Sequence, residues 1–266
     1  MGVSRIYPPA MLPANSLIPI RDDNPTHSFA IVSVVLIVLN VAIFFLLQPN
    51  FGEVRSCAAA DSRCQQSNID SARFLCAYGT VPRELTGEDA SEPKVCSTLP
   101  GITKSPTASV ITSMFLHGGI LHIAGNMLFL WVFGNNIEDV LGKTKFVIFY
   151  LLTGVIATLA HVFGNVSSDV PTIGASGAIA GLLGAYIVLF PKARVMTVVP
   201  IFFFLQFIRL PAALVLGIWF FSQFLIGGGQ QAGTGVAWLA HVGGFAAGAL
   251  LIIPFGGRRG RRAIAY

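Results

Sequence analysis

Ser176 and His241 are the two residues whose types could act together as a nucleophile and a base. Ser176 lies in PTIGASGAIAGLLGAY, residues 171–186, where a loop enters an apolar run. At a helix start, unpaired backbone N–H groups and the positive dipole end could receive an oxyanion while the hydroxyl attacks a carbonyl. A helix N-cap is the common alternative role for such a serine. GASG alone does not decide between the two.

His241 lies in AHVGGFAAG, residues 240–248, near the end of another apolar run. Glycines recur beside both candidates, and small residues four apart let helices approach closely. They are Gly177, Gly181 and Gly184 near Ser176, and Gly244 and Gly248 near His241. The two runs are therefore predicted to pack tightly enough for Ser176 and His241 to form a hydrogen bond.

A third polar group lies in HGGILHIAGNM, residues 117–127. His122 and Asn126 are four residues apart and share one helix face, and His117 is placed on the loop leading in. Such residues also serve as interhelical hydrogen-bonding groups, but three converging at one depth favour a site. His122, Asn126 and the Ser176 N–H are predicted to stabilise an oxyanion. The loss of one such donor costs about 100- to 1,000-fold in rate.

Acidic residues are missing from every apolar run, and the nearest ones are Glu138, Asp139 and Asp169. A Ser–His dyad is therefore favoured over a triad, with the imidazole first taking the serine proton and then giving it to the leaving amine. His161 lies away from these motifs and is predicted to be structural.

The elements that position these residues are predicted to be membrane-spanning helices. The chain of 266 residues is 54% hydrophobic and only 11% charged, against about 25% charged in soluble domains. Runs of about 20 apolar residues are long enough to cross a bilayer. The sequence thus predicts an all-α polytopic membrane protein with six spans, at about 29–48, 120–137, 145–164, 175–190, 209–227 and 236–255.

Basic residues predict the orientation of these spans. Lys143, Lys145 and four terminal arginines flank the spans on one side, whereas the loops at 165–174 and 228–235 contain no Lys or Arg. The positive-inside rule then places both termini in the cytoplasm of a cell-membrane protein, with an N-terminal tail over 1–28 and a basic tail over 256–266. No cleavable signal is expected. The basic residues form no face interleaved with aromatics, which argues against nucleic-acid binding.

A long external loop is predicted over 49–116 and contains all four cysteines, Cys57, Cys64, Cys76 and Cys96. An even set outside the membrane favours two disulfides, with the pairing left open. A metal site is the alternative, but CxxC pairs and nearby histidines are lacking. On the opposite side, the apolar stretch 195–208 contains Pro200 and is expected to form a hairpin or an interfacial segment.

Together, these motifs resemble the rhomboid family of intramembrane serine proteases. The resemblance covers 29–255 and rests on HxxxxHxxxN, GxSG and AHxxGxxxG in that order. It implies a six-helix rhomboid-like bundle, with Ser176 as nucleophile, His241 as base, and His122 and Asn126 at the oxyanion hole. His117, Gly174 and Gly177 would support them. Transmembrane proteins in the bilayer would be the substrates, and no metal or other cofactor is implied.

The sequence departs from the family pattern at two places. Many members have Trp-Arg where Ala108 and Ser109 stand, and many have an aromatic residue where Ala180 stands. The second departure leaves open how His241 is held. The alternatives are an inactive rhomboid-like binder of membrane proteins, which would typically have lost the serine or histidine, and a six-span transporter, which would show intramembrane acids or repeated halves. Neither a particular substrate nor an oligomeric state follows from these residues.

Overall fold

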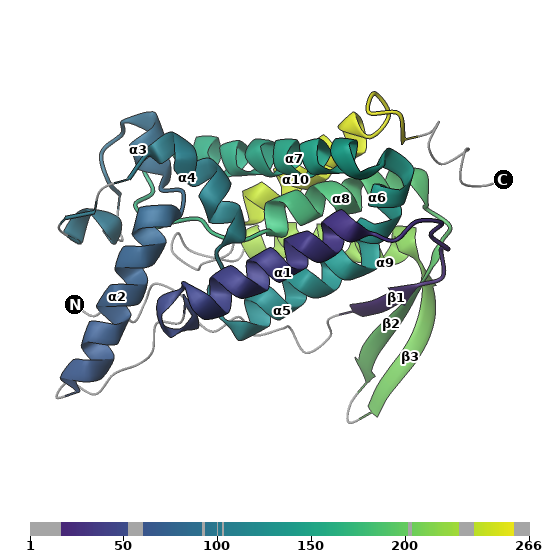
Figure 1. The fold of residues 1–266 in the computed structure, drawn as a ribbon, viewed down its shortest axis with the longest axis horizontal. Coiled ribbons are helices and arrows are strands. Elements are labelled where there is room, and N and C mark those ends of the chain that lie inside the picture. Colours follow the sequence, from purple (N-terminus) through teal and green to yellow (C-terminus); the bar gives the residue numbers. More distant parts are fainter. Residues whose placement is uncertain are drawn as a thin grey trace.

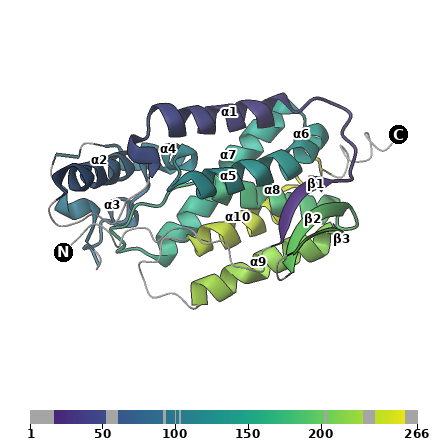
Figure 2. The same ribbon diagram turned by 90° about the horizontal axis from the view of Figure 1, so that it is seen from below.

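The structure is a computed structural model that describes residues 17–52, 61–91, 94–99, 101–102, 104–201, 204–228 and 237–257. Its apolar helices run side by side, with α2, α3 and α4 gathered at one end and a three-stranded sheet at the other (Figure 1). The view from below shows the same separation (Figure 2). Cys57, the four C-terminal arginines and most of the 228–235 loop lie outside the described residues.

Six apolar helices correspond to the six predicted spans. Two, Ile120–Leu141 and Lys143–Gly164, are long and apolar enough to cross a membrane. The first combines α5 (Ile120–Phe129), a π-helical turn and α6 (Asn135–Leu141), and the second is α7 (Lys143–Gly164). The shorter ones are α1 (Ile31–Leu46), α8 (Ser176–Leu189), α9 (Ala212–Gly228) and α10 (Trp238–Leu251). That all six cross the bilayer stays a prediction.

Glycines bring α8 and α10 into backbone contact. A Cβ atom at Gly248 would lie 1.8 Å from the carbonyl oxygen of Gly181, and one at Gly244 would lie 2.1 Å from that of Gly177. In the other direction, a Cβ at Gly184 would meet the Phe245 carbonyl oxygen at 2.0 Å. Only residues without a side chain allow this approach. The close packing predicted from glycine spacing is therefore present.

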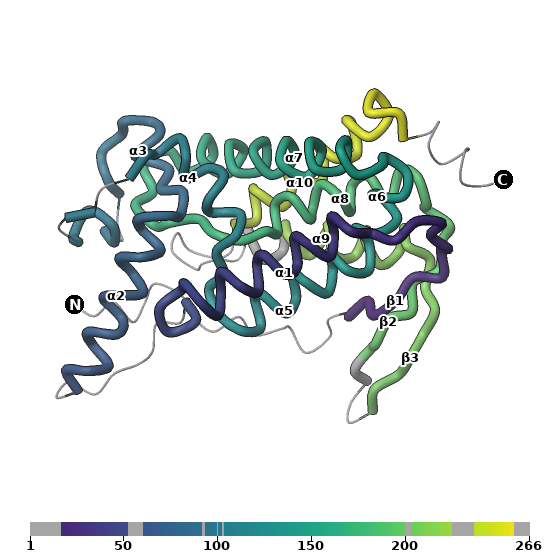
Figure 3. Tube along the Cα trace, in the orientation of Figure 1, coloured from purple at the N-terminus to yellow at the C-terminus, as the bar shows by residue number. Residues whose placement is uncertain are grey.

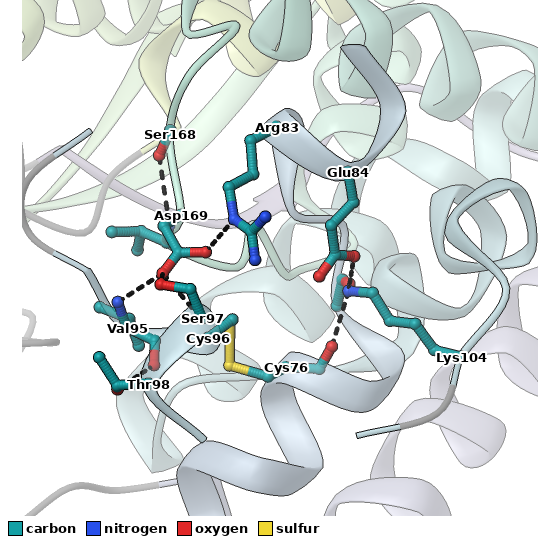
Figure 4. Close-up of a disulfide and its surroundings, with 12 residues drawn as sticks. Cys76, Arg83, Glu84, Val95, Cys96, Ser97, Thr98, Lys104, Ser168 and Asp169 are labelled. Atoms are coloured by element: carbon teal, nitrogen blue, oxygen red, sulfur yellow. Dashed lines mark hydrogen bonds and ion pairs between the residues drawn. A yellow bond between two sulfur atoms is a disulfide. The ribbon is translucent and has the colours of Figure 1, made fainter. Parts of the chain in front are cut away.

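The segment before α5 folds into a small cap on one end of the bundle. It contains α2 (Ser62–Tyr78), α3 (Pro82–Thr86), α4 (Pro106–Thr112) and short 3-10 turns. A disulfide joins Cys76 to Cys96 (Figure 4), and Cys64 is also disulfide-bonded. We call residues 61–116 the cap.

The cap is hydrogen-bonded to the loop that leads into α8. Thr80 and Thr172 form an isolated antiparallel bridge, and the Gly174 N–H donates to the Ser113 carbonyl at 2.8 Å. The trace shows α7 running towards the cap and α8 returning from it (Figure 3). Ser176 therefore lies at the cap end of the bundle.

The Asp169 carboxylate accepts several of the hydrogen bonds that attach the cap to the loop before α8 (Figure 4). This buried group accepts bonds from the Arg83 guanidinium, from the Val95 N–H at 2.7 Å and from the Ser97 N–H at 2.9 Å. Burial raises the pKa of Asp169, but the bonds from Arg83, Ser97 and Val95 outweigh it, so the pKa lies below its ordinary value of 3.8. Asp169 does not fold back onto His241.

Replacing Asp169 with Asn is expected to lower the thermal unfolding midpoint at pH 7 by several degrees, because charge-assisted bonds are lost from a buried site. A carboxyl with a lowered folded-state pKa stabilises above its unfolded-state pKa and loses that contribution as pH falls through the folded-state value. The difference in unfolding midpoint between Asp169→Asn and wild type should therefore disappear as the pH falls below about 4. Thermal unfolding in detergent across pH measures this. Asp70→Asn on the exposed face of α2 is the control, and a gap that persists in acid would contradict the assignment.

The small sheet corrects the all-α prediction. The stretch 195–208 forms most of a hairpin of β2 (Arg194–Ile201) and β3 (Phe204–Pro211), and β1 (Ile18–Asp22) pairs antiparallel with β2. The predicted hairpin is confirmed, whereas a strand in the N-terminal tail was not expected. Exposed apolar side chains lie along β3. That this hairpin lies in the membrane interface stays a prediction.

Buried acids secure the sheet end of the bundle. Glu138 accepts from the N–H groups of Val32 and Ser33 at 2.9 and 2.8 Å, and so satisfies donors at the start of α1. Asp22 accepts from the Tyr186 hydroxyl at 2.6 Å and the Asn136 amide at 2.7 Å. These acids therefore have structural partners at the end of the bundle opposite the cap.

Candidate active site

Ser176 and His241 form a hydrogen-bonded pair where α8 and α10 meet. The Ser176 Oγ lies 2.8 Å from Nε2 of His241. Ser176 is the first residue of α8, and His241 lies in the first turn of α10, so the close helix contact brings their side chains together. This distance is within the range for proton transfer between a hydroxyl and an imidazole.

The position of Ser176 distinguishes between the two roles that the sequence allowed, nucleophile and helix N-cap. The N-cap residue of α8 is Ala175, whose side chain forms no capping hydrogen bond. The Ser176 hydroxyl is instead directed at His241. The first N–H groups of a helix have no intrahelical acceptor, so those at the start of α8 are available as donors beside the Ser176 hydroxyl.

His122 lies next to this pair, with Gly174 between. A Cβ atom at Gly174 would be 3.0 Å from His122 Nε2 and 3.5 Å from Ser176 Oγ, and Gly174 has a φ of +123°. The other ring nitrogen, Nδ1, accepts from the Gly118 N–H at 3.1 Å. In a neutral ring Nδ1 is then the acceptor and Nε2 carries the hydrogen. His122 therefore presents a donor on the Gly174 side, the side of Ser176.

Asn126 and His117 support the same region less directly. The Asn126 amide donates to the His122 carbonyl at 3.0 Å, within their own helix. His117 is fully buried, and its ring lies 5.1 Å from that of His122 in an edge-on arrangement. Burial lowers the pKa of His117 well below its ordinary value, so the ring is neutral. Gln48 bonds to both the N–H and the carbonyl of His117.

Gly177 is needed for helix packing beside Ser176. A Cβ atom there would lie 2.7 Å from Cβ of Ala157 on α7. A small pocket opens at this point, lined by Ser176 and mostly by small residues. They include Ser113, Gly154, Gly174, Gly177, Ala178, Ala237 and Ala240. Among the described residues no group of three metal-ligating side chains occurs.

Two side chains of α9 contact His241 and were missed by the sequence analysis. Nδ1 of His241 lies 2.7 Å from Oε1 of Gln223, and the Trp219 ring packs with its centroid 5.8 Å from the imidazole. The imidazole is thus held from α9, while Ala180 occupies the place of the aromatic residue on α8. The available signal was a single amide in the apolar stretch 209–227, four residues after a tryptophan.

A family model described as the Rhomboid domain matches residues 105–258, more than half of the chain and the part that contains Ser176, His241 and His122. The chain belongs to the rhomboid family. It is therefore a membrane protein of a family that contains proteases.

Individual relatives agree with this assignment. Rhomboid protease GluP of Bacillus subtilis (strain 168) is 32% identical over 246 residues, which cover 91% of this chain and 38% of GluP. The human presenilin-associated rhomboid-like protein, mitochondrial, is 34% identical over 110 residues, covering 38% of this chain and 29% of that protein. Rhomboid protein 1, mitochondrial, of Saccharomyces cerevisiae is 34% identical over 92 residues, covering 33% of this chain and 27% of that protein. The chain spans less than half the length of each of these rhomboid relatives.

Proposed function

We propose that this rhomboid is an intramembrane serine endopeptidase that cleaves transmembrane proteins with a Ser176–His241 dyad. The observation that carries the proposal is the 2.8 Å contact between Ser176 Oγ and His241 Nε2. It joins a nucleophile to a base at the start of two apolar helices. The family contains a protein named as a protease, GluP, which matches over 91% of this chain.

In the proposed reaction, Ser176 attacks the carbonyl carbon of the scissile peptide bond while its proton passes to His241 Nε2. The imidazolium then returns that proton to the departing amine, and an acyl-serine remains. Water then attacks the acyl carbon while its proton passes to the same imidazole. As the ester bond to Oγ breaks, the imidazolium returns that proton to Ser176 and the carboxyl product leaves. No cofactor enters these steps.

The oxyanion of the tetrahedral intermediate is assigned to three donors. His122 offers Nε2–H beside Gly174, and the α8 start offers the Ser176 N–H. Asn126 is the third, since one amide hydrogen remains after its bond to the His122 carbonyl. These donors act where negative charge develops, and the apolar surroundings strengthen them.

We infer that cleavage occurs near the outer face of a cell membrane, with both termini in the cytoplasm and six spans. The disulfide-bonded cap lies at the Ser176 end of the bundle, and disulfides persist in oxidising compartments. The terminal arginines would lie on the opposite, cytoplasmic side, as the positive-inside rule requires.

A fluorophosphonate probe tests the proposal directly. Because it forms a covalent bond only with an activated serine, wild-type protein in detergent is expected to be labelled and Ser176→Ala is expected to remain unlabelled. Labelling is read by in-gel fluorescence, and the labelled residue by peptide mass mapping. An unlabelled wild type that binds transmembrane segments would support the inactive binder instead.

A further inference from the structure

In the part of the chain that the structure describes, no carboxylate bonds to His241 as an aspartate does in a Ser–His–Asp triad. Acids near the bundle bond elsewhere: Glu138 to the start of α1, and Asp169 to the cap. The group that faces Nδ1 of His241 is instead the Gln223 side chain of α9, at 2.7 Å. We propose that Gln223 is a positioning residue that fixes the tautomer of His241, an inference that rests on the proposed dyad.

The orientation of the Gln223 amide follows from its other bonds. Its nitrogen, Nε2, donates to the Trp219 carbonyl at 3.1 Å and to the Ser222 hydroxyl at 3.2 Å. A carbonyl oxygen can only accept, so the amide nitrogen must point along α9 towards Trp219. The amide oxygen, Oε1, is therefore the atom presented to His241.

The tautomer of His241 follows from that oxygen. Oε1 of Gln223 has no hydrogen to donate, so Nδ1 of His241 must carry the hydrogen in their bond. In a neutral imidazole the lone pair then lies on Nε2, the atom 2.8 Å from Ser176 Oγ. The serine hydroxyl consequently donates to His241, which is the arrangement needed for a general base.

Gln223 is also able to act as a fixed support. The residue is only 5% exposed, and a buried amide keeps its bonds because an unpaired polar atom is costly. Trp219, one turn earlier on α9, packs against the same imidazole. In the transition state the ring becomes an imidazolium, and its bond to Oε1 becomes charge-assisted and stronger.

Two substitutions distinguish positioning from packing. Gln223→Met keeps the length of the side chain but removes the acceptor, whereas Gln223→Glu keeps an oxygen at the same place. The rate of fluorophosphonate labelling at Ser176 reports the dyad without substrate docking. We expect Gln223→Met to slow labelling by about 10- to 100-fold, the value of a bond to a charged group. Gln223→Glu keeps an acceptor for Nδ1 but loses the two bonds that Nε2 donates, so it should label more slowly than wild type and faster than Gln223→Met.

The rates at which the variants cleave a single-span substrate should follow the same order as their labelling rates, with kcat reduced and KM unchanged in Gln223→Met. The matched control is Asn40→Leu, since Asn40 is a buried amide in α1 that also donates to a carbonyl four residues earlier, at 2.7 Å. It is expected to leave the labelling rate unchanged.

Wild-type labelling rates in Gln223→Met would overturn the proposal, and so would equal losses in the Met and Glu variants, which indicate packing alone.

Nitrogen-15 NMR of the wild-type imidazole is a test that does not depend on a variant folding. Nδ1-protonated His241 is expected, and Nε2-protonated His241 would contradict the inference. If wild type itself resists labelling, the dyad fails, and this result is distinguishable from a fault in Gln223 alone.

Discussion

The double variant Ser176→Ala, His241→Ala is expected to cleave a transmembrane substrate no more slowly than either single variant. Each single change should reduce cleavage by about 10,000-fold or more, because nucleophile and base act as one unit. Once the hydroxyl is gone, the imidazole has no proton to accept. Once the imidazole is gone, the hydroxyl remains protonated and weakly nucleophilic.

The measurement is cleavage of a single-span substrate by purified protein in liposomes, with each variant compared at equal folded concentration. His27→Ala is the control, since this exposed histidine lies outside the candidate site. Independent roles for the two residues would make the losses multiply. Multiplied losses, or a single variant with undiminished cleavage, would rule out the dyad.

Much of the candidate site was predictable from the sequence because the polar residues stand out from apolar surroundings. Ser176, His241 and His122 each lie in a stretch with few other polar groups, and glycine spacing indicated which helices meet. The 2.8 Å bond between Ser176 and His241 agrees with that expectation. Polar residues at membrane depth are rare enough that a few of them indicate a site.

Other features depend on contacts that sequence spacing does not encode. Gln223 looked like an isolated amide, and only the packing of α9 against α10 brings it to His241. The strand β1 pairs with residues more than 170 positions away, as in Ile18 with Val198, and its own sequence, IPIRD, carries a weak strand pattern. The pairing of Cys76 with Cys96 was likewise one of three possible connectivities.

Replacing Gly248 with Ala is expected to slow labelling of Ser176 by about 100-fold and to destabilise the bundle. The new Cβ atom would lie 1.8 Å from the Gly181 carbonyl oxygen and 2.5 Å from its carbon. Both atoms belong to the backbone of α8, so no side chain can rotate away. The helices would have to separate by roughly 1 Å, and a displacement of that size at a reacting pair costs about 100-fold in rate.

Gly217→Ala provides the matched control. Gly217 is also a helical glycine, in α9, but a Cβ atom there would meet none of the described residues within 4 Å. Alanine is favoured over glycine in helices by about 1 kcal/mol, so this variant should be as stable as wild type or more so. Thermal unfolding and probe labelling of the two variants separate close helix contact from helix propensity. If Gly248→Ala labels like wild type, then α8 and α10 do not need backbone contact to bring Ser176 to His241.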